Sequence, residues 1–91
     1  MAYLNEDRLS RLAAANSAIR ALRGIGIRVM RVSLGQGESL PQLVGQGREA
    51  QLPQLCHIAT GVRAPQFDAR AFAVFPGALA VIHMQKEHHH D

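Results

Sequence analysis

The apolar residues near the C-terminus (residues 69–84, ARAFAVFPGALAVIHM) have the pattern of a β-hairpin that is apolar on both faces. A turn at Pro76-Gly77 would place Phe72, Val74, Leu79 and Val81 on one face. The other face would carry Ala71, Ala73, Phe75, Ala78, Ala80 and Ile82. Successive side chains of a strand point to opposite sides of the sheet, so a half-exposed strand alternates apolar and polar residues. Because neither face is polar here, both faces need a cover.

The N-terminal segment has the apolar spacing of an α-helix over residues 5–24. Asn5 is a suitable N-cap, and Glu6 and Asp7 then suit the positive end of the helix dipole. Gly24 is placed to end the helix. The predicted apolar stripe consists of Leu9, Leu12, Ala15, Ile19 and Leu22. This helix can cover one face of the hairpin, so we expect another protein chain to cover the second.

The region between the helix and the hairpin is predicted to add strands to one sheet over residues 27–84. The predicted strands are residues 27–34, 40–44, 55–62, 69–75 and 78–84. In the first of these, the apolar residues do not keep to one face of the strand. A bulge near Val29-Met30 would bring them to one face. Pro41 lacks an amide donor, which favours an edge position for its strand. The glycine-rich stretches at 35–37 and 45–47 are interpreted as loops.

The predicted fold class is therefore α+β: one N-terminal helix on a mostly antiparallel sheet of four to five strands, in the order α-β-β-β-β-β. Residues 1–91 form a single domain, and residues 85–91 form a polar tail. A chain of this size buries about 60–65% of its unfolded surface, which favours self-association as a further source of stability.

The two faces of the hairpin differ in side-chain size, and this suggests different roles. Small alanine side chains would let a helix approach closely, so we expect the face of Phe72, Val74, Leu79 and Val81 to be the protein-binding surface. The reverse assignment is also compatible with the sequence. Arg20, Arg23, Arg28 and Arg31 would supply a polar rim able to meet acidic groups.

The chain is basic, with a formal net charge of +3, and arginines are concentrated near its N-terminus. Six of them lie within residues 8–31 with no acid between them. Such a cluster can attract phosphates or a partner's carboxylates. The alternative function is thus a small basic nucleic-acid-binding protein. A single-strand binder would normally interleave aromatic side chains for base stacking, and the phenylalanines lie far from this cluster in sequence.

No residue pattern predicts catalysis, a cofactor or a metal site. Cys56 and His57 would point to opposite faces of a strand, which excludes a nucleophile–base contact between them, and a small buried thiol is expected instead. Three consecutive histidines at 88–90 are interpreted as part of the polar tail rather than as a structural metal site. We therefore expect a non-enzymatic protein.

The expected location is the cytoplasm. A lone cysteine excludes an internal disulfide and fits a reducing compartment. The N-terminal residues MAYLNEDRL lack a signal-peptide pattern, and no apolar run approaches the roughly 20 residues that span a bilayer.

The layout resembles that of small accessory proteins of temperate phages and prophages. The similarity is carried by LRGIG at the end of the helix, the strand IRVMRVSLG, Leu-Pro at 40–41 and the closing FPGALAVIHM. This resemblance implies a non-enzymatic protein that binds, and in some cases inhibits, a host protein. The expected partners are a second copy of the chain, a host protein, or both.

Overall fold

The structure is a computed structural model, and it describes residues 6–65 and 68–85. Its elements are α1 (Glu6–Gly24), β1 (Arg28–Ser33), β2 (Gln42–Arg48), the 3-10 turn η1 (Glu49–Gln51), α2 (Leu52–Ile58), β3 (Gly61–Arg63), β4 (Arg70–Phe75) and β5 (Ala78–Gln85). The α+β class and the N-terminal helix are confirmed. The predicted N-cap Asn5 lies outside the described residues, as does the predicted tail from residue 86 onward, whereas Gln85 belongs to β5.

The five strands form one sheet in the order β1-β2-β5-β4-β3. Neighbouring strands are antiparallel except for β2 and β5, which run parallel. Parallel strands need a long crossover connection. Residues 49–77, which contain α2, β3 and β4, provide it. The mostly antiparallel sheet is confirmed, and α2 is an addition to the predicted order.

The C-terminal hairpin has the predicted register. Pro76-Gly77 forms the turn between β4 and β5, and Gly77 adopts φ +73°, a conformation that glycine reaches without steric cost. Val74 pairs with Leu79, and Phe72 pairs with Val81. The local turn chemistry was therefore sufficient to predict the pairing of these two strands.

Strand β1 lies at one edge of the sheet and carries the predicted bulge. Its register with β2 shifts between Val29 and Arg31, so that Met30 has no partner in the ladder. A bulge and charged side chains are two ways in which natural sheets prevent an edge strand from pairing with another chain. We therefore do not expect sheet extension at β1.

Pro41 is not at a sheet edge, and that prediction is wrong. The strand that follows it, β2, lies between β1 and β5. The ladder with β5 begins at Gln42, so the missing amide proton of Pro41 falls outside it. The carbonyl oxygen of Pro41 accepts a hydrogen bond from the backbone N–H of Leu79 at 2.9 Å, which ties this buried residue to the sheet.

Residues 45–47 are part of β2 rather than a loop, and the reason is tertiary. A Cβ on Gly45 would lie 2.9 Å from the backbone oxygen of Arg28 and 3.1 Å from the side chain of Ile82. Ile27 fills the space beside both glycines of this stretch. Glycine is depleted in strands, but here it permits a close approach of the neighbouring chain.

The strand predicted over residues 55–62 is mostly helix. Residues 52–58 form α2, and only residues 61–63 form a strand. Pro53 stands in the first turn of α2, a position where a missing N–H costs no hydrogen bond. Leu55 is fully buried beneath the sheet. Helix α2 therefore contributes to the core and covers one end of it.

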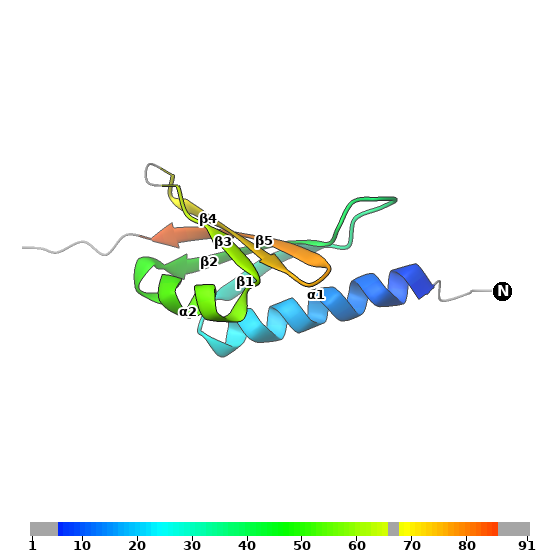
Figure 1. Ribbon diagram of the computed structural model, residues 1–91, viewed down its shortest axis with the longest axis horizontal. Helices are drawn as coiled ribbons and strands as arrows, with labels where there is room; N and C mark the ends of the chain where they lie inside the picture. The colour runs from blue at the N-terminus through cyan, green and yellow to red at the C-terminus, as the bar shows by residue number, and fades with distance from the viewer. Residues whose placement is uncertain (1–5, 66–67, 86–91) are drawn as a thin grey trace, which may run out of the picture.

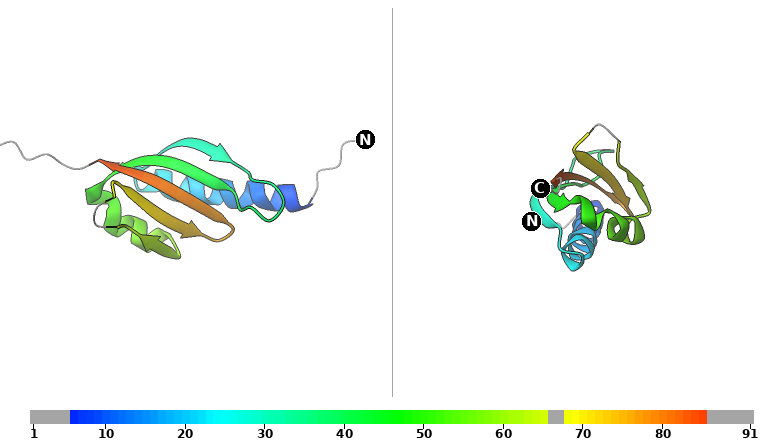
Figure 2. Two further views of the ribbon diagram at one scale, coloured as in Figure 1. Left: turned by 90° about the horizontal axis from the view of Figure 1, so that it is seen from above. Right: turned by 90° about the vertical axis from the view of Figure 1, so that its left-hand side faces the viewer.

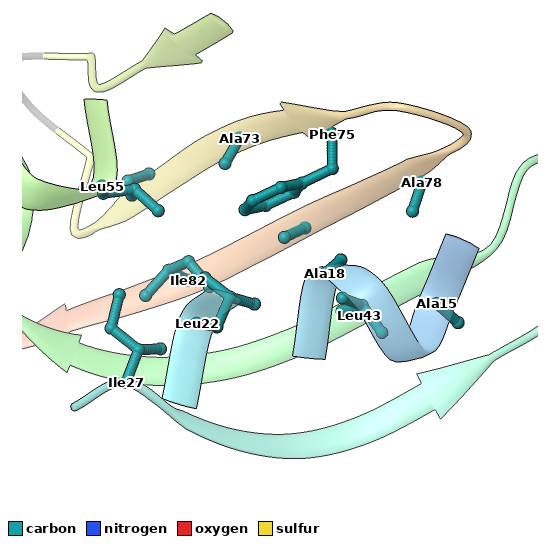
Figure 3. Packing of buried hydrophobic residues seen from close by; sticks show 12 residues of the cluster. Ala15, Ala18, Leu22, Ile27, Leu43, Leu55, Ala73, Phe75, Ala78 and Ile82 are labelled. Atoms are coloured by element: carbon teal, nitrogen blue, oxygen red, sulfur yellow. The ribbon is translucent and has the colours of Figure 1, made fainter. Parts of the chain in front are cut away.

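The core lies between the helices and the alanine-rich face of the hairpin (Figure 3). The buried residues of the hairpin are Ala71, Ala73, Phe75, Ala78, Ala80 and Ile82, and those of α1 are Ala15, Ala18 and Leu22. Leu9 and Leu12 of the predicted stripe are each 44% exposed, and Ile19 is only partly buried. The stripe that packs follows positions 15, 18 and 22, which leaves Leu9 and Leu12 on the flank of the helix.

The molecule thus has two layers, a sheet and a pair of helices. Both α1 and α2 lie on the same side of the sheet (Figure 1), and the view onto the sheet from above shows its strands in front of the helices (Figure 2). The opposite face of the sheet is covered by none of the described residues. We call this surface the open face.

Candidate interaction surface

The centre of the open face is apolar. The register across β2, β5 and β4 aligns Val44, Val81 and Phe72 in one row, and Leu79 and Val74 are paired in the next. Directly paired residues share a face of a sheet, so these five side chains form one surface. We call them the apolar patch.

The two faces of the hairpin differ sharply in exposure. Val74 is 45% exposed and the other members of the apolar patch are partly buried. On the opposite side, Ala73 is 1% and Ala80 is 2% exposed. The apolar patch is therefore accessible to a partner in a way that the alanine-rich face is not. A contiguous exposed apolar surface with a polar margin is typical of an interaction site.

Arginines flank the apolar patch on two sides and at one end. In the row of Val44 and Phe72, Arg31 stands on β1 beside Val44, and Arg63 stands on β3 beside Phe72. The same alternation brings three more arginines to the open face. The five together, which we call the arginine border, are Arg28, Arg31, Arg48, Arg63 and Arg70, all of them exposed.

Arg70 is the member of the arginine border whose side chain forms an ion pair within the described residues. Its guanidinium donates to both carboxylate oxygens of Asp68 at 3.1 and 3.0 Å, and its backbone N–H donates to the same carboxylate at 2.9 Å. These hydrogen bonds lower the pKa of Asp68. The guanidinium carbon also lies 5.4 Å from the centre of the Phe72 ring, within the range of a cation–π contact. The contacts with Asp68 and Phe72 therefore fix the position of the Arg70 side chain at this edge of the apolar patch.

The structure divides the residues predicted as a protein-binding site. Phe72, Val74, Leu79 and Val81 all lie on the open face, and the alanine-rich face meets the helix as expected. Arg28 and Arg31 belong to the arginine border. Arg20 and Arg23 do not, because they are exposed positions of α1 on the other side of the sheet. Arg20 and Arg23 therefore do not stand on the open face with the others, and the binding role of all eight residues stays a prediction.

Sequence reasoning missed four members of this surface: Val44, Arg48, Arg63 and Arg70. Val44 was assigned to an edge strand, and the glycines after it to a loop, which hid the continuation of β2 to Arg48. Arg70 stands two residues before Phe72 on the same strand, so its face could have been read from the alternation alone. Arg63 depended on the pairing of β3 with β4, which the sequence did not indicate.

The other candidate groups were Cys56, the residues considered for a metal site, and the C-terminal histidines. Cys56 lies on α2 and is exposed, so the prediction of a buried thiol is wrong. Among the described residues, no three His, Cys, Asp or Glu side chains are grouped to hold a metal ion. The histidines at 88–90 lie outside the described residues.

The arginine cluster at 8–31 is likewise split between two layers. Part of it lies on α1 and part on β1. Arg11 forms an ion pair with Asp7 at 3.2 Å and donates to the carbonyl oxygen of Gly37. The hydrogen bond to Gly37 ties α1 to the loop between β1 and β2, so this arginine has a structural role.

No protein-family model, curated protein sequence or solved structure matches this chain. In the part of the chain that the structure describes, neither helix has the length and apolar character needed to cross a bilayer.

Proposed function

We propose that this protein is a non-enzymatic binding module that docks another protein on its open face. The observation that carries the proposal is the apolar patch, five aliphatic and aromatic side chains left uncovered on a sheet whose other face packs against the helices through its central strands. The arginine border flanks this patch on two sides and at one end, as part of a polar rim flanks the apolar centre of a protein interface. Docking there would occlude part of the partner's surface. If the resemblance to phage accessory proteins holds, the partner is a host protein and occlusion inhibits it.

The composition of the patch favours a protein over a nucleic acid. Single-stranded nucleic acids bind sheets through aromatic rings on which successive bases stack. Among the described residues, the open face offers the ring of Phe72, over which Arg70 already lies, and the exposed imidazole of His83, but no succession of aromatic rings. Val44, Val81 and Leu79 beside Phe72 are aliphatic and suit the apolar side chains of a protein.

The charge of the border favours a foreign partner over a second copy of the chain. Two open faces brought together would bury two apolar patches but would also bring two sets of five arginines into one interface. Like charges juxtaposed in an interface oppose association. A partner with carboxylates around its apolar residues would instead form arginine–carboxylate pairs, for which the planar guanidinium is well suited.

Site-specific photo-crosslinking in the organism's own cells tests this proposal. Val74 and Leu12 are a matched pair of positions, since they are 45% and 44% exposed but lie on the open face and on α1. Each is replaced in turn by a photo-crosslinking amino acid. We expect one discrete protein adduct from position 74 and none from position 12. Adding Val81→Asp should abolish the adduct.

Four outcomes would contradict the proposal. These are no adduct at position 74, adducts of equal yield from both positions, an adduct only with a second copy, and an adduct with nucleic acid. The last would favour the alternative function, in which the arginine border binds phosphates.

A further inference from the structure

We infer that the element bound on the open face is an amphipathic α-helix that carries carboxylates on both flanks of its apolar stripe. This inference rests on the proposed function and specifies the partner of the same surface. It follows from the width of the patch, the absence of hydrogen-bonding groups within it, and the placement of the arginines on both sides.

The width of the patch matches one helix. Arg31 and Arg63 end the same row of the sheet, with Val44, Val81 and Phe72 between them. Adjacent strands are about 4.8 Å apart, so four spacings separate these arginines by roughly 19 Å at the backbone. An α-helix with its side chains is about 10–12 Å wide. A helix lying along the strands would fill the apolar row and leave one arginine on each side of it.

The chemistry of the patch requires a partner element that satisfies its own backbone. The side chains of Val44, Phe72, Val74, Leu79 and Val81 offer neither donors nor acceptors. An extended segment laid over them would lose water from backbone groups that find no new partner. A helix makes its backbone hydrogen bonds internally and can present only side chains to the patch.

The arginines on the two sides are available for a partner's carboxylates. Within residues 6–65 and 68–85, neither Arg31 nor Arg63 forms an ion pair, whereas Arg70 is held by Asp68. Arg31 and Arg63 face the same row from opposite edges of the sheet. A helix with acidic residues on only one flank would leave one of them without a partner. Carboxylates on both flanks would pair with both.

Two synthetic peptides test the inference directly. Both are about 20 residues long, a length at which an isolated helix becomes stable in water. Both carry the same leucine stripe, but one has glutamates on its two flanks and the other has lysines at the same positions. Binding to the full chain is measured by two-dimensional NMR, which also reports which amides shift. The glutamate peptide should bind at least about tenfold more tightly than the lysine peptide. Each glutamate–arginine pair raises the affinity by a small factor and each lysine–arginine pair lowers it by a small factor, and these factors multiply over the pairs.

Charge reversal on the protein provides the matched control. The variant Arg31→Glu plus Arg63→Glu should reverse the preference, so that the lysine peptide binds more tightly. The variant Arg20→Glu plus Arg23→Glu makes the same change in net charge on α1 and should keep the preference for the glutamate peptide. All four arginines are exposed, so both variants should fold, and the dispersion of the NMR spectrum verifies this.

The inference is overturned if neither peptide binds, if both bind equally, if the shifted amides lie on α1, or if both protein variants change the preference alike. A peptide that fails while position 74 still crosslinks to a protein would refute the helix and leave the proposed function standing. Failure of both experiments would refute both. A single-stranded oligonucleotide that displaces the glutamate peptide through Arg31 and Arg63 would assign the surface to nucleic acid instead.

Discussion

Replacing Gly45 with alanine should destabilise the protein, although alanine is the better residue in an ordinary strand interior. The new Cβ would lie 2.9 Å from the backbone oxygen of Arg28, 3.1 Å from Ile82 and 3.3 Å from Ile27. Overpacking of this kind costs about 1–3 kcal/mol. The smaller entropy of the unfolded alanine chain offsets about 0.4–1 kcal/mol of that. We therefore expect a net loss of about 1–2 kcal/mol, because a backbone oxygen cannot move aside as the end of a side chain can.

Gly61→Ala is the matched control. Gly61 also lies in a strand, but a Cβ there would meet nothing within 4 Å, and its φ is not in the left-handed region. This variant should gain about 0.4–1 kcal/mol. Urea denaturation followed by circular dichroism measures both, and the melting temperature of Gly45→Ala should fall by roughly 4–16 °C. A Gly45→Ala variant as stable as the wild type, or an equal loss in both variants, would refute the close approach of Ile27 and Arg28 to β2.

Three further predictions concern the support of the fold. Gln51 accepts a hydrogen bond from one backbone N–H at 2.8 Å and donates to a backbone carbonyl at 3.0 Å, so Gln51→Ala should cost about 1–2 kcal/mol in urea denaturation. The exposed Gln54→Ala serves as its control and should cost less than about 0.5 kcal/mol. Leu55→Ala should cost about 2–5 kcal/mol, because this side chain of α2 is fully buried; a loss below 1 kcal/mol would argue against the packing of α2. The Asp68 carboxylate should titrate below the ordinary aspartate value of about 3.9 in NMR, because its hydrogen bonds with Arg70 favour the charged form. Its contribution to stability is therefore present above that pH and is lost as the pH falls through the lowered pKa. Arg70→Gln should raise the pKa of Asp68 towards the ordinary value without restoring it fully, because the backbone N–H of residue 70 still donates to the carboxylate.

The parts of the fold that the sequence predicted were those fixed by local chemistry. Pro76-Gly77 set the register of the hairpin, and the broken alternation at Val29-Met30 indicated the bulge of β1. The parts it missed depend on contacts between distant residues. Arg28, Ile82 and Ile27 lie too close to Gly45 for a larger residue of that strand, and the parallel pairing of β2 with β5 joins segments more than 30 residues apart.

The second helix was missed for a different reason. The residues 55–62 contain a short apolar run that fits a strand and a helix equally well, and such runs are ambiguous by periodicity alone. Two signals for the helix were nonetheless present. Pro53 suits a first helical turn, and Leu52, Leu55 and Ile58 recur at a spacing of three residues.

The sequence predicted the part of the candidate site that lies on the hairpin. Phe72 and Val74 were assigned to the correct face because the register of the hairpin was correct. The border was predicted only in part: Arg28 and Arg31 belong to it, whereas Arg63 joins it only through β3 and Arg20 lies on α1 beneath the sheet. Side chains that meet across several strands could not be grouped before the strand order was known.

Solvent accessibility of the methyl groups in the free protein tests the central claim, that the sheet has one uncovered apolar face. A soluble gadolinium chelate speeds the relaxation of exposed methyl protons in NMR. We predict strong enhancement for Val74, Leu79 and Val81 and weak enhancement for Ile82 and Leu43, at every protein concentration tested. Methyl groups of Val74 and Val81 as well protected as those of Ile82 would contradict the claim, because the open face would then already be covered.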